Sequence, residues 1–274
     1  ADDSGTGFRL ITYNVWYGFT QVPKRKTAYL EWIRDQAPDI VCLQELNGYT
    51  QEKLSEDASA WGHSYSVLLK TEGFPTGITS RDAIEDIQRT FDGFHHGLLR
   101  VRIRGMYVYV IHLHPSNWEA RLRESVLILK DVASLPKESE VILAGDFNTF
   151  SSDDAKYYQH GQLEPFFSER DEMFSEKNLR DGQLDYSVIE RFKKAGLTDL
   201  ENSMRDEDFV FSGSFPTKIE KTGEDGSARR LDYVFASSGL AGRTTRAETI
   251  ASEKTWTLSD HLPVIVDFMQ EDVE

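Results

Sequence analysis

The chain contains very little cysteine, has a shortage of basic residues and lacks any long apolar segment. Its 274 residues include a single cysteine, Cys42, which excludes an intramolecular disulfide and a zinc site built from several cysteines. No apolar run approaches the roughly 18 residues that a membrane-spanning helix requires. The 31 Lys and Arg residues face 46 Asp and Glu residues, which gives a formal charge of −15. A long nucleic acid is therefore a disfavoured partner, because sequence-independent binding of a polyphosphate depends on clustered basic side chains.

Apolar material, by contrast, is sufficient for a folded core. Hydrophobic residues make up 39% of the chain and aromatic residues 12%, a composition that excludes a disordered protein. No linker, internal repeat or low-complexity tract divides the sequence, so we expect a single domain over residues 1–274 and a monomer. The sequence begins at Ala1-Asp2-Asp3 rather than at a methionine, as it would after removal of a signal peptide. We therefore expect a secreted or periplasmic protein, with a cytoplasmic location as the alternative.

The spacing of apolar residues predicts an α/β fold with many strands and interspersed helices. Helices are predicted at 23–36 and 119–135, and Arg104-Gly105 is a suitable turn for a hairpin. Strands are predicted at 8–15, 39–44, 67–69, 77–80, 98–103, 107–113, 141–144, 231–235 and 262–268. This pattern favours two sheets packed face to face with helices outside. The stretch 151–183 loses clear periodicity after Tyr158, and long ordered excursions of this kind are often functional.

Polar side chains follow the ends of several of these predicted strands. If the strand ends converge, they bring together three carboxylates, two asparagines and two or three histidines. Rigid strand ends hold side chains with the accuracy that catalysis needs, and this donor set suits Mg²⁺ or Mn²⁺ rather than a thiolate-bound metal. The five segments are Tyr13-Asn14, Gln44-Glu45, His112-Leu113-His114, Gly145-Asp146-Phe147-Asn148 and Ser259-Asp260-His261. A sixth segment, Leu231-Asp232-Tyr233, places a further acid inside a predicted strand.

Each of these residues, taken alone, has an ordinary structural interpretation. Glu45 fits a solvated strand terminus, Asp146 and Asn148 are common turn residues, and a lone His112 fits a hydrogen-bonded core histidine. The functional interpretation is favoured because all the segments occur in one chain and in this order.

The ordered set of motifs resembles the endonuclease/exonuclease/phosphatase superfamily. That group includes deoxyribonucleases, abasic-site endonucleases, neutral sphingomyelinases and inositol polyphosphate 5-phosphatases. The resemblance extends from about residue 8 to residue 268 and depends most on Gly-Asp-Phe-Asn together with Ser-Asp-His. It implies a four-layer α/β sandwich and metal-dependent cleavage of a phosphoester. It also implies that Glu45 is the main ligand of the divalent ion, Mg²⁺ or Mn²⁺, with Asn14 and Asp260 completing the ligand shell.

The resemblance further implies roles for the remaining motif residues. Asp146 and Asn148 would position the attacking water and the scissile phosphate. His261 would be the general base or a phosphate clamp, oriented by Asp232, and His112 would donate to a phosphate oxygen or protonate the leaving group. These roles agree with the chemistry, because an attacking water needs a base and a carboxylate fixes the tautomer of the imidazole.

The identity of the substrate is less clearly encoded. Abasic-site endonucleases of this family have a tyrosine where this chain has His112, so the resemblance is closer to the histidine-bearing members. Arg121, on the helix after this strand, is a candidate phosphate ligand, and His114 is an additional histidine near the site. The basic group Lys218, Lys221, Arg229 and Arg230 is diluted by neighbouring acids, whereas a nuclease that tracks a duplex normally has a stronger basic stripe.

We therefore predict hydrolysis of a small or lipid-derived phosphoester, either a diester or a monoester, by an activated water. One alternative is a secreted metal-dependent endonuclease acting on DNA or RNA, because a local field can outweigh the net charge. The other is a non-catalytic binding module on the same fold, which the intact set of motifs disfavours.

Overall fold

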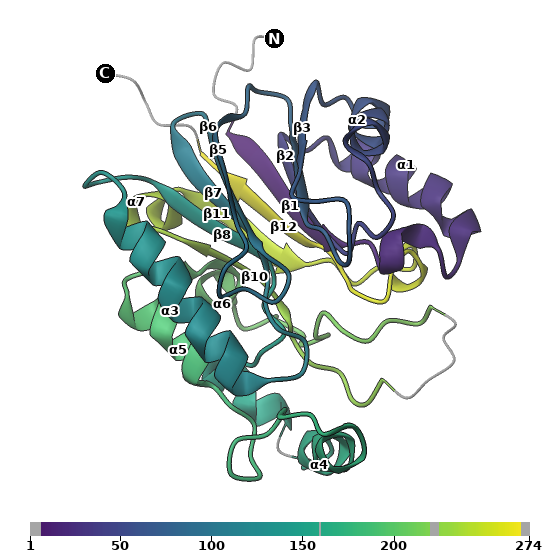
Figure 1. Cartoon of the computed structure of the whole chain (residues 1–274), viewed down its shortest axis with the longest axis vertical. Helices are drawn as coiled ribbons and strands as arrows, with labels where there is room; N and C mark the ends of the chain where they lie inside the picture. The colour runs from purple at the N-terminus through teal and green to yellow at the C-terminus, as the bar shows by residue number, and fades with distance from the viewer. Residues whose placement is uncertain (1–6, 159, 220–224, 270–274) are drawn as a thin grey trace.

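The computed structural model describes residues 7–158, 160–219 and 225–269. Within these residues, two six-stranded mixed sheets are packed face to face (Figure 1). The first sheet has the order β11-β12-β1-β2-β4-β3 and the second the order β5-β6-β7-β8-β10-β9. The strands are β1 Phe8–Asn14, β2 Ile40–Gln44, β3 Tyr65–Leu68, β4 Gly77–Ser80, β5 Glu85–Thr90, β6 Leu98–Ile103, β7 Met106–His112, β8 Val141–Asp146, β9 Thr198–Asp199, β10 Asp232–Ala236, β11 Thr244–Thr249 and β12 Val264–Phe268.

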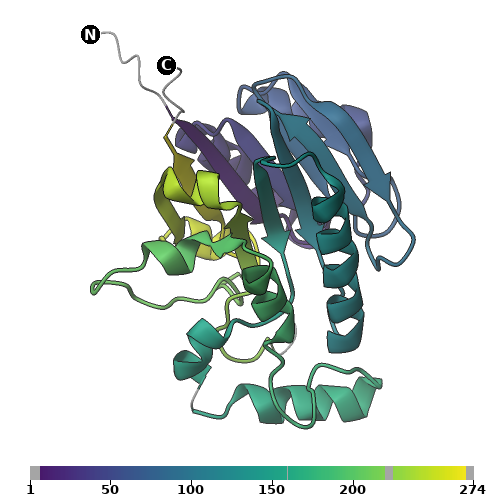
Figure 2. The same ribbon diagram turned by 90° about the vertical axis from the view of Figure 1, so that its left-hand side faces the viewer.

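Helices cover the outer face of each sheet, which confirms the predicted α/β sandwich (Figures 1 and 2). Helices α1 and α2 pack on the first sheet, and α3 and α5 pack on the second. The helices are α1 Lys26–Gln36, α2 Gln51–Ala60, α3 Trp118–Ser134, α4 Leu163–Phe174, α5 Ser187–Lys194, α6 Leu200–Met204 and α7 Ser238–Gly242. None of the helices in the described part of the chain is long and apolar enough to span a membrane.

The alternation of side chains along the strands produces these layers. Leu10 and Cys42 point into the core between the sheets, whereas Ile11 and Tyr13 pack against α1 on the outer face. Side chains on a strand alternate between faces, so an uninterrupted apolar strand is buried on both sides. Burial also raises the pKa of the Cys42 thiol, which fits the predicted role of a small buried hydrophobe.

The strands predicted from the sequence are all present, with bounds that agree within about two residues. The hairpin turn at Arg104-Gly105 is confirmed, because both residues have positive φ angles, 51° and 81°, as a tight two-residue turn requires. The sequence missed β5, β9 and β11. Most side chains of β5 and β11 are exposed or half-buried, and β9 has only two residues, so these strands at the sheet edges carry little hydrophobic signal.

The excursion at 151–183 is ordered and has a small core of its own. It contains a 3₁₀ segment, Ser152–Tyr158, and the helix α4, which lies apart from the two sheets (Figures 1 and 2). Phe150, Leu163 and Phe167 pack together with Leu231, the residue just before β10. This contact attaches the excursion to the end of the second sheet at which the predicted site residues lie.

Candidate active site

Strand register brings the predicted site residues to one end of the sandwich. In the first sheet, Asn14 is paired with Gln44 across parallel strands, so Glu45 follows at the same edge. In the second sheet, Asp146 is paired both with His112 on β7 and with Asp232 on β10. The convergence expected from the sequence therefore follows from the pairing of neighbouring strands.

Asn14 connects the two sheets at this point. Its buried side chain donates from Nδ2 to Glu45 Oε1 and to Asp146 Oδ2, both at 3.2 Å. Its Oδ1 accepts from the main-chain nitrogen of Trp16 at 2.8 Å, which fixes the amide orientation. Asn14 thus holds a carboxylate from each sheet through one side chain.

Gly145 has a conformation and a setting that no other residue fits. Its φ angle is 152°, and a Cβ atom added there would lie 2.0 Å from the main-chain oxygen of Ile111. This close approach places Asp146 beside His112. Asn148 then closes the turn, donating from its main-chain nitrogen to Asp146 Oδ1 and from Nδ2 to Leu113 O, both at 3.0 Å.

Asp232 and His261 form a buried hydrogen-bonded pair. The His261 Nδ1 atom lies 2.7 Å from Asp232 Oδ2, and its Nε2 lies 3.6 Å from Asp146 Oδ2. Burial lowers the pKa of His261, but the charges of Asp232 and Asp146 outweigh burial and raise this pKa to about 10. His261 is therefore an imidazolium at neutral pH, with Nδ1 held by Asp232 and Nε2 directed toward Asp146.

His112 has the opposite electrostatic setting. Burial, together with the neighbouring rings of His96 and His261, keeps the pKa of His112 well below its ordinary value. Its ring stacks on His96, with centroids 4.0 Å apart, and its Nε2 lies 3.7 Å from Asp146 Oδ2. His112 is thus a neutral imidazole at physiological pH.

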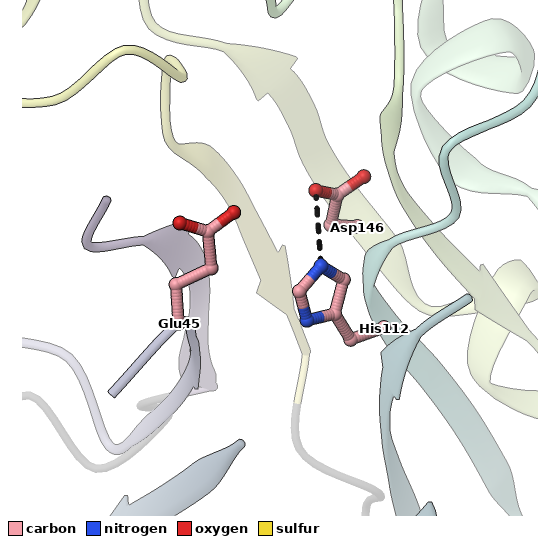
Figure 3. A group of neighbouring side chains, drawn as sticks. All are labelled: Glu45, His112 and Asp146. Carbon is pink, nitrogen blue, oxygen red and sulfur yellow. Dashed lines mark ion pairs between the residues drawn. The ribbon is translucent and has the colours of Figure 1, made fainter. Parts of the chain in front are cut away.

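Glu45, His112 and Asp146 come from three strand ends and face a common space (Figure 3). One donor atom from each lies within 4.8 Å of the others. Burial and the charge of Asp260 raise the pKa of Glu45. Burial also raises the pKa of Asp146 to about 8, against the lowering effect of His261. The donor set is rich in carboxylate oxygen and has excess negative charge, so it fits a hard divalent cation.

The cluster lines a cavity of about 440 Å³. Most of the residues that the sequence singled out reach its wall, namely Glu45, His112, Arg121, Asp146, Asn148, Asp260 and His261. Asn14 and Asp232 lie behind these residues and hold Asp146 and His261. His114 does not reach the wall: its ring packs on His95, with centroids 4.1 Å apart.

The cavity wall also contains residues that the sequence analysis did not assign to the site. They come from several separate segments and include Trp16, Tyr17, Phe74, His95, His96, Phe167, Arg170, Asn178, Phe215 and Arg229. Among these residues, only the adjacent histidines His95 and His96 stand out in the sequence as candidate site residues. Of the basic group near β10, Arg229 faces the cavity, Arg230 is buried in ion pairs, and Lys221 lies outside the described residues.

The two sheets bring carboxylates, amides and the Asp232–His261 pair together at one end of the sandwich. This arrangement is typical of a phosphoester hydrolase. Residues 11–261 match the Endonuclease/Exonuclease/phosphatase family. The chain belongs to this family and is a phosphoesterase. No curated protein matches the sequence.

Several solved structures share the fold over nearly the whole chain. An AP endonuclease from Archaeoglobus fulgidus is 18% identical, with a TM-score of 0.65. The 3′ phosphatase NExo from Neisseria, bound to a product DNA hairpin, is 17% identical, and the 3′-5′ exonuclease NExo from Neisseria meningitidis is 16% identical, both with a TM-score of 0.66. Each comparison covers 95% of this chain and 99% of the other. At these identities the similarity establishes a shared fold.

Proposed function

We propose that this protein is a divalent-metal-dependent phosphoesterase that hydrolyses a small or lipid-derived phosphoester by in-line attack of an activated water. The observation that carries the proposal is Asp146. Its Oδ2 atom lies at the meeting point of Asn14, His112 and the Asp232–His261 pair. A phosphoesterase needs an acceptor for the proton of water and donors for the phosphate oxygens, and this arrangement supplies both.

Glu45 is the proposed main ligand of Mg²⁺ or Mn²⁺, with Asp260 beside it. Asn14 supports this site rather than completing the ligand shell, because it presents Nδ2 to the carboxylates while its Oδ1 accepts from Trp16. Glu45 is held ready by hydrogen bonds from Asn14 Nδ2 and from the main-chain nitrogen of Tyr17, at 3.2 and 3.0 Å. When bound, such an ion neutralises the charge that develops on the non-bridging phosphate oxygens. Burial and the repulsion from Asp260 both raise the pKa of Glu45, and the closeness of the two carboxylates supports a cation at this position.

Asp146 is the proposed acceptor of the proton from the attacking water. Burial raises the pKa of Asp146, which makes its carboxylate a stronger proton acceptor than an exposed aspartate. His261, as an imidazolium, donates from Nε2 to a phosphate oxygen while Asp232 holds Nδ1. This division favours the phosphate-clamp role of His261 over the general-base role that the sequence left open.

His112 and Asn148 complete the phosphate-binding side of the site. Because the pKa of His112 is far below neutral, this residue acts as a neutral hydrogen-bond donor rather than as an acid for the leaving group. Asn148 holds the loop after β8 through its bond to Leu113 O and lines the cavity beside Asp146.

A nuclease is the second candidate function. It is favoured by the names of the solved structures with the same fold, an AP endonuclease and a 3′ phosphatase bound to a product DNA hairpin. The charge of −15 opposes it, because this charge repels a polyanion at long range. A non-catalytic module is disfavoured because the acid–histidine cluster is assembled in full.

A panel of substrates tests the proposal. With Mg²⁺ or Mn²⁺ present, an aryl phosphodiester, sphingomyelin, inositol polyphosphates, plasmid DNA, abasic duplex and RNA are compared as substrates. We expect cleavage of a small or lipid-derived ester that is lost with EDTA and reduced about 10²–10⁴-fold in His261→Ala. Activity that survives both EDTA and the His261→Ala substitution contradicts the metal mechanism. Activity confined to DNA or RNA contradicts the small substrate and supports the nuclease function instead.

A further inference from the structure

Two arginines in the cavity wall are almost completely buried and form no ion pair with a carboxylate in the described part of the chain. Arg121, on α3, is 1% exposed, and Arg229, three residues before Asp232, is 6% exposed. Neither forms an ion pair with any residue that the structure describes. The neighbouring Arg230 is equally buried, but Asp154 and Asp199 each lie 2.7 Å from its guanidinium. Arg25, which is 5% exposed, also has no ion pair among the described residues, but both of its Nη atoms donate to main-chain oxygens. Other buried arginines of the fold are thus satisfied either by carboxylates or at both Nη atoms.

The two guanidinium groups are held in the same way. Nη1 of Arg121 donates to the main-chain oxygen of His114 at 3.1 Å. Nη1 of Arg229 donates to the main-chain oxygens of Asp225 and Ser227, at 2.6 and 2.9 Å. In both arginines Nε is buried without a partner among the described residues, and Nη2 donates to none of them. The Nε–Nη2 edge is the fork with which arginine binds an oxyanion through two parallel hydrogen bonds.

Aromatic rings hold the guanidinium of Arg229 in place. It lies 5.5, 5.2 and 4.7 Å from the ring centroids of Phe166, Phe167 and Phe215. Phe215 also packs against the ring of His261, with centroids 4.9 Å apart. The same ring thus positions both Arg229 and the histidine of the hydrolytic cluster.

Both arginines remain positively charged at neutral pH. Burial lowers the pKa of each to about 10. The charges of Asp185 and Glu124 oppose this effect on Arg121, that of Asp225 opposes it on Arg229, and that of Asp146 adds a smaller contribution to both. An unpaired buried charge is costly unless a ligand supplies its partner. An anion entering the cavity between the two groups is such a partner.

We infer that the Nε–Nη2 edges of Arg121 and Arg229 form a second anion subsite, which binds an additional phosphate-type group of a small substrate. The inference rests on the proposed function, because this second group belongs to the molecule that is hydrolysed.

The location of Arg229 separates this subsite from the scissile phosphate. Arg229 also lines an adjoining pocket of about 280 Å³, together with Arg170, Glu176 and Asn178. None of the acid–histidine residues reaches that pocket. Arg121 lines only the main cavity. A group held by both arginines can therefore extend past Arg229 toward the adjoining pocket, away from the phosphate that Asp146 and His261 face.

The depth of both arginines favours a small substrate over a polymer. With at most 6% of either residue exposed, the forks are reachable only by a slender terminal group that enters the cavity. Arginines that contact a duplex backbone lie on an open basic surface. The substrate class is therefore a small phosphoester that carries a second phosphate or similar anion.

Binding of inorganic phosphate to the metal-free protein tests the subsite without catalysis. Isothermal titration in EDTA is performed on the wild type, on Arg121→Met and Arg229→Met, and on Arg123→Gln, an exposed arginine on the same helix. We expect at least a tenfold loss of affinity in each Met variant and none in Arg123→Gln. Arg121→Lys and Arg229→Lys keep the charge without the fork and should bind with intermediate affinity. Wild-type protein that binds no phosphate, or Met variants that bind it as the wild type does, overturns the inference.

Two aryl phosphodiesters with the same leaving group, one carrying a second phosphate, test the assignment to substrate. We expect the Met variants to lower kcat/KM at least tenfold more for the doubly charged ester than for the other ester, mainly through KM. An equal loss on both esters means that the arginines bind the scissile phosphate, which overturns the second subsite. A loss confined to a single-stranded oligonucleotide overturns the small substrate. If neither ester is cleaved, the proposed function fails, while the titration still decides whether the anion subsite exists.

Discussion

Asp146 is the residue at which the contacts of the site are concentrated. Its Oδ2 atom lies 3.2 Å from Asn14 Nδ2, 3.6 Å from His261 Nε2 and 3.7 Å from His112 Nε2. Two histidines at nearly equal distance from one carboxylate have opposite pKa shifts. Burial, assisted by the ring of His96, lowers the pKa of His112, whereas the charges of Asp232 and Asp146 outweigh burial at His261. The carboxylate behind Nδ1 therefore accounts for much of the difference in charge between the two rings.

Replacement of Asp232 by asparagine tests this electrostatic assignment. Asp232→Asn removes the charge that raises the pKa of His261, so we expect this pKa to fall from about 10 and turnover to fall about 10²–10⁴-fold. NMR titration of the His261 ring protons, together with kcat, measures both effects. Asp267→Asn, which breaks an ion pair with Arg9, is the control and should change neither quantity. An unchanged His261 pKa would contradict the role of Asp232.

Replacement of Glu45 by glutamine tests the proposed metal site. In EDTA, Glu45→Gln removes repulsion with Asp260, so the variant should melt at a higher temperature than the wild type. Ion at 100 times its Kd should stabilise the wild type by about 2.7 kcal/mol but not the variant. Thermal melts with and without Mg²⁺ or Mn²⁺ measure this difference, and the exposed Glu52→Gln is the matched control. Equal stabilisation of both proteins by the ion would exclude Glu45 as a ligand.

At the scale of the secondary structure elements, strand ends and their register determine where the site forms. Parallel pairing of β7 with β8 places His112 opposite Asp146, and antiparallel pairing with β10 adds Asp232. The cavity wall farther from the sheets comes from α3 and from the excursion that contains α4. The chemistry therefore depends on rigid strands, whereas the substrate-facing wall is built from helices and loops.

Gly145 permits the close approach of β7 and β8. In Gly145→Ala the new methyl group meets Ile111 O at 2.0 Å and φ remains positive, at 152°. Gly105→Ala is the control, because its φ of 81° is also positive but no atom lies within 4 Å of the added carbon. We expect Gly145→Ala to lower the free energy of unfolding by at least about 2 kcal/mol more than Gly105→Ala does. Urea denaturation measures this difference, and equal losses would refute the steric argument.

His63 provides a pH-dependent contribution to the first sheet. Its ring nitrogens lie 2.8 Å from Thr79 Oγ1 and 2.8 Å from Pro38 O, and burial lowers its pKa below the ordinary value of 6.5. Below pH 6.5 the unfolded chain binds a proton at His63 that the folded chain does not. The free energy of unfolding should therefore decrease as the pH falls through this range.

The variant His63→Gln isolates this contribution. It should cost about 1–3 kcal/mol at pH 8, where the neutral ring makes both bonds, and less at pH 5. Urea denaturation at several pH values measures the slope, and the exposed His160→Gln is the control. A variant with the same pH slope as the wild type would show that His63 is not the titrating group.

At the scale of the whole molecule, the cavity and the surface have different electrostatics. The total charge is −15, yet the wall of the cavity contains Arg121, Arg229 and the imidazolium of His261. A small anion experiences mainly the nearby cations, whereas a long polyanion is also exposed to the field of the whole surface.

This difference predicts an unusual salt dependence. Proteins that bind DNA through basic clusters lose affinity steeply as salt increases, because counterion release drives binding. For this protein, added NaCl screens the repulsion between the acidic surface and DNA. Any affinity for a DNA duplex should therefore stay constant or increase between about 50 and 200 mM NaCl, whereas basic proteins lose affinity over this range. Fluorescence anisotropy with a labelled duplex measures this affinity, with a basic DNA-binding protein as the reference. A steep loss of affinity would reveal a basic DNA-binding surface and favour the nuclease.

The sequence by itself determined the strands with a continuous apolar pattern, the two main amphipathic helices and the polar residues at the strand ends, but not the edge strands β5, β9 and β11. These features are local: apolar alternation fixes the faces of a strand, and Asp146 or His112 is at a strand end whatever the strand packs against. The motifs were therefore sufficient to predict the layered fold and the phosphoester chemistry.

Only the tertiary structure decided which side chains meet. Asn14 and Asp146 lie 132 positions apart in the chain and are joined because two sheets pack at one end. Arg121 and Arg229, distant in sequence, line one cavity as buried charges without a carboxylate partner in the described part of the chain. The sequence does not encode such relations locally, because the burial and pairing of a charge depend on packing between elements.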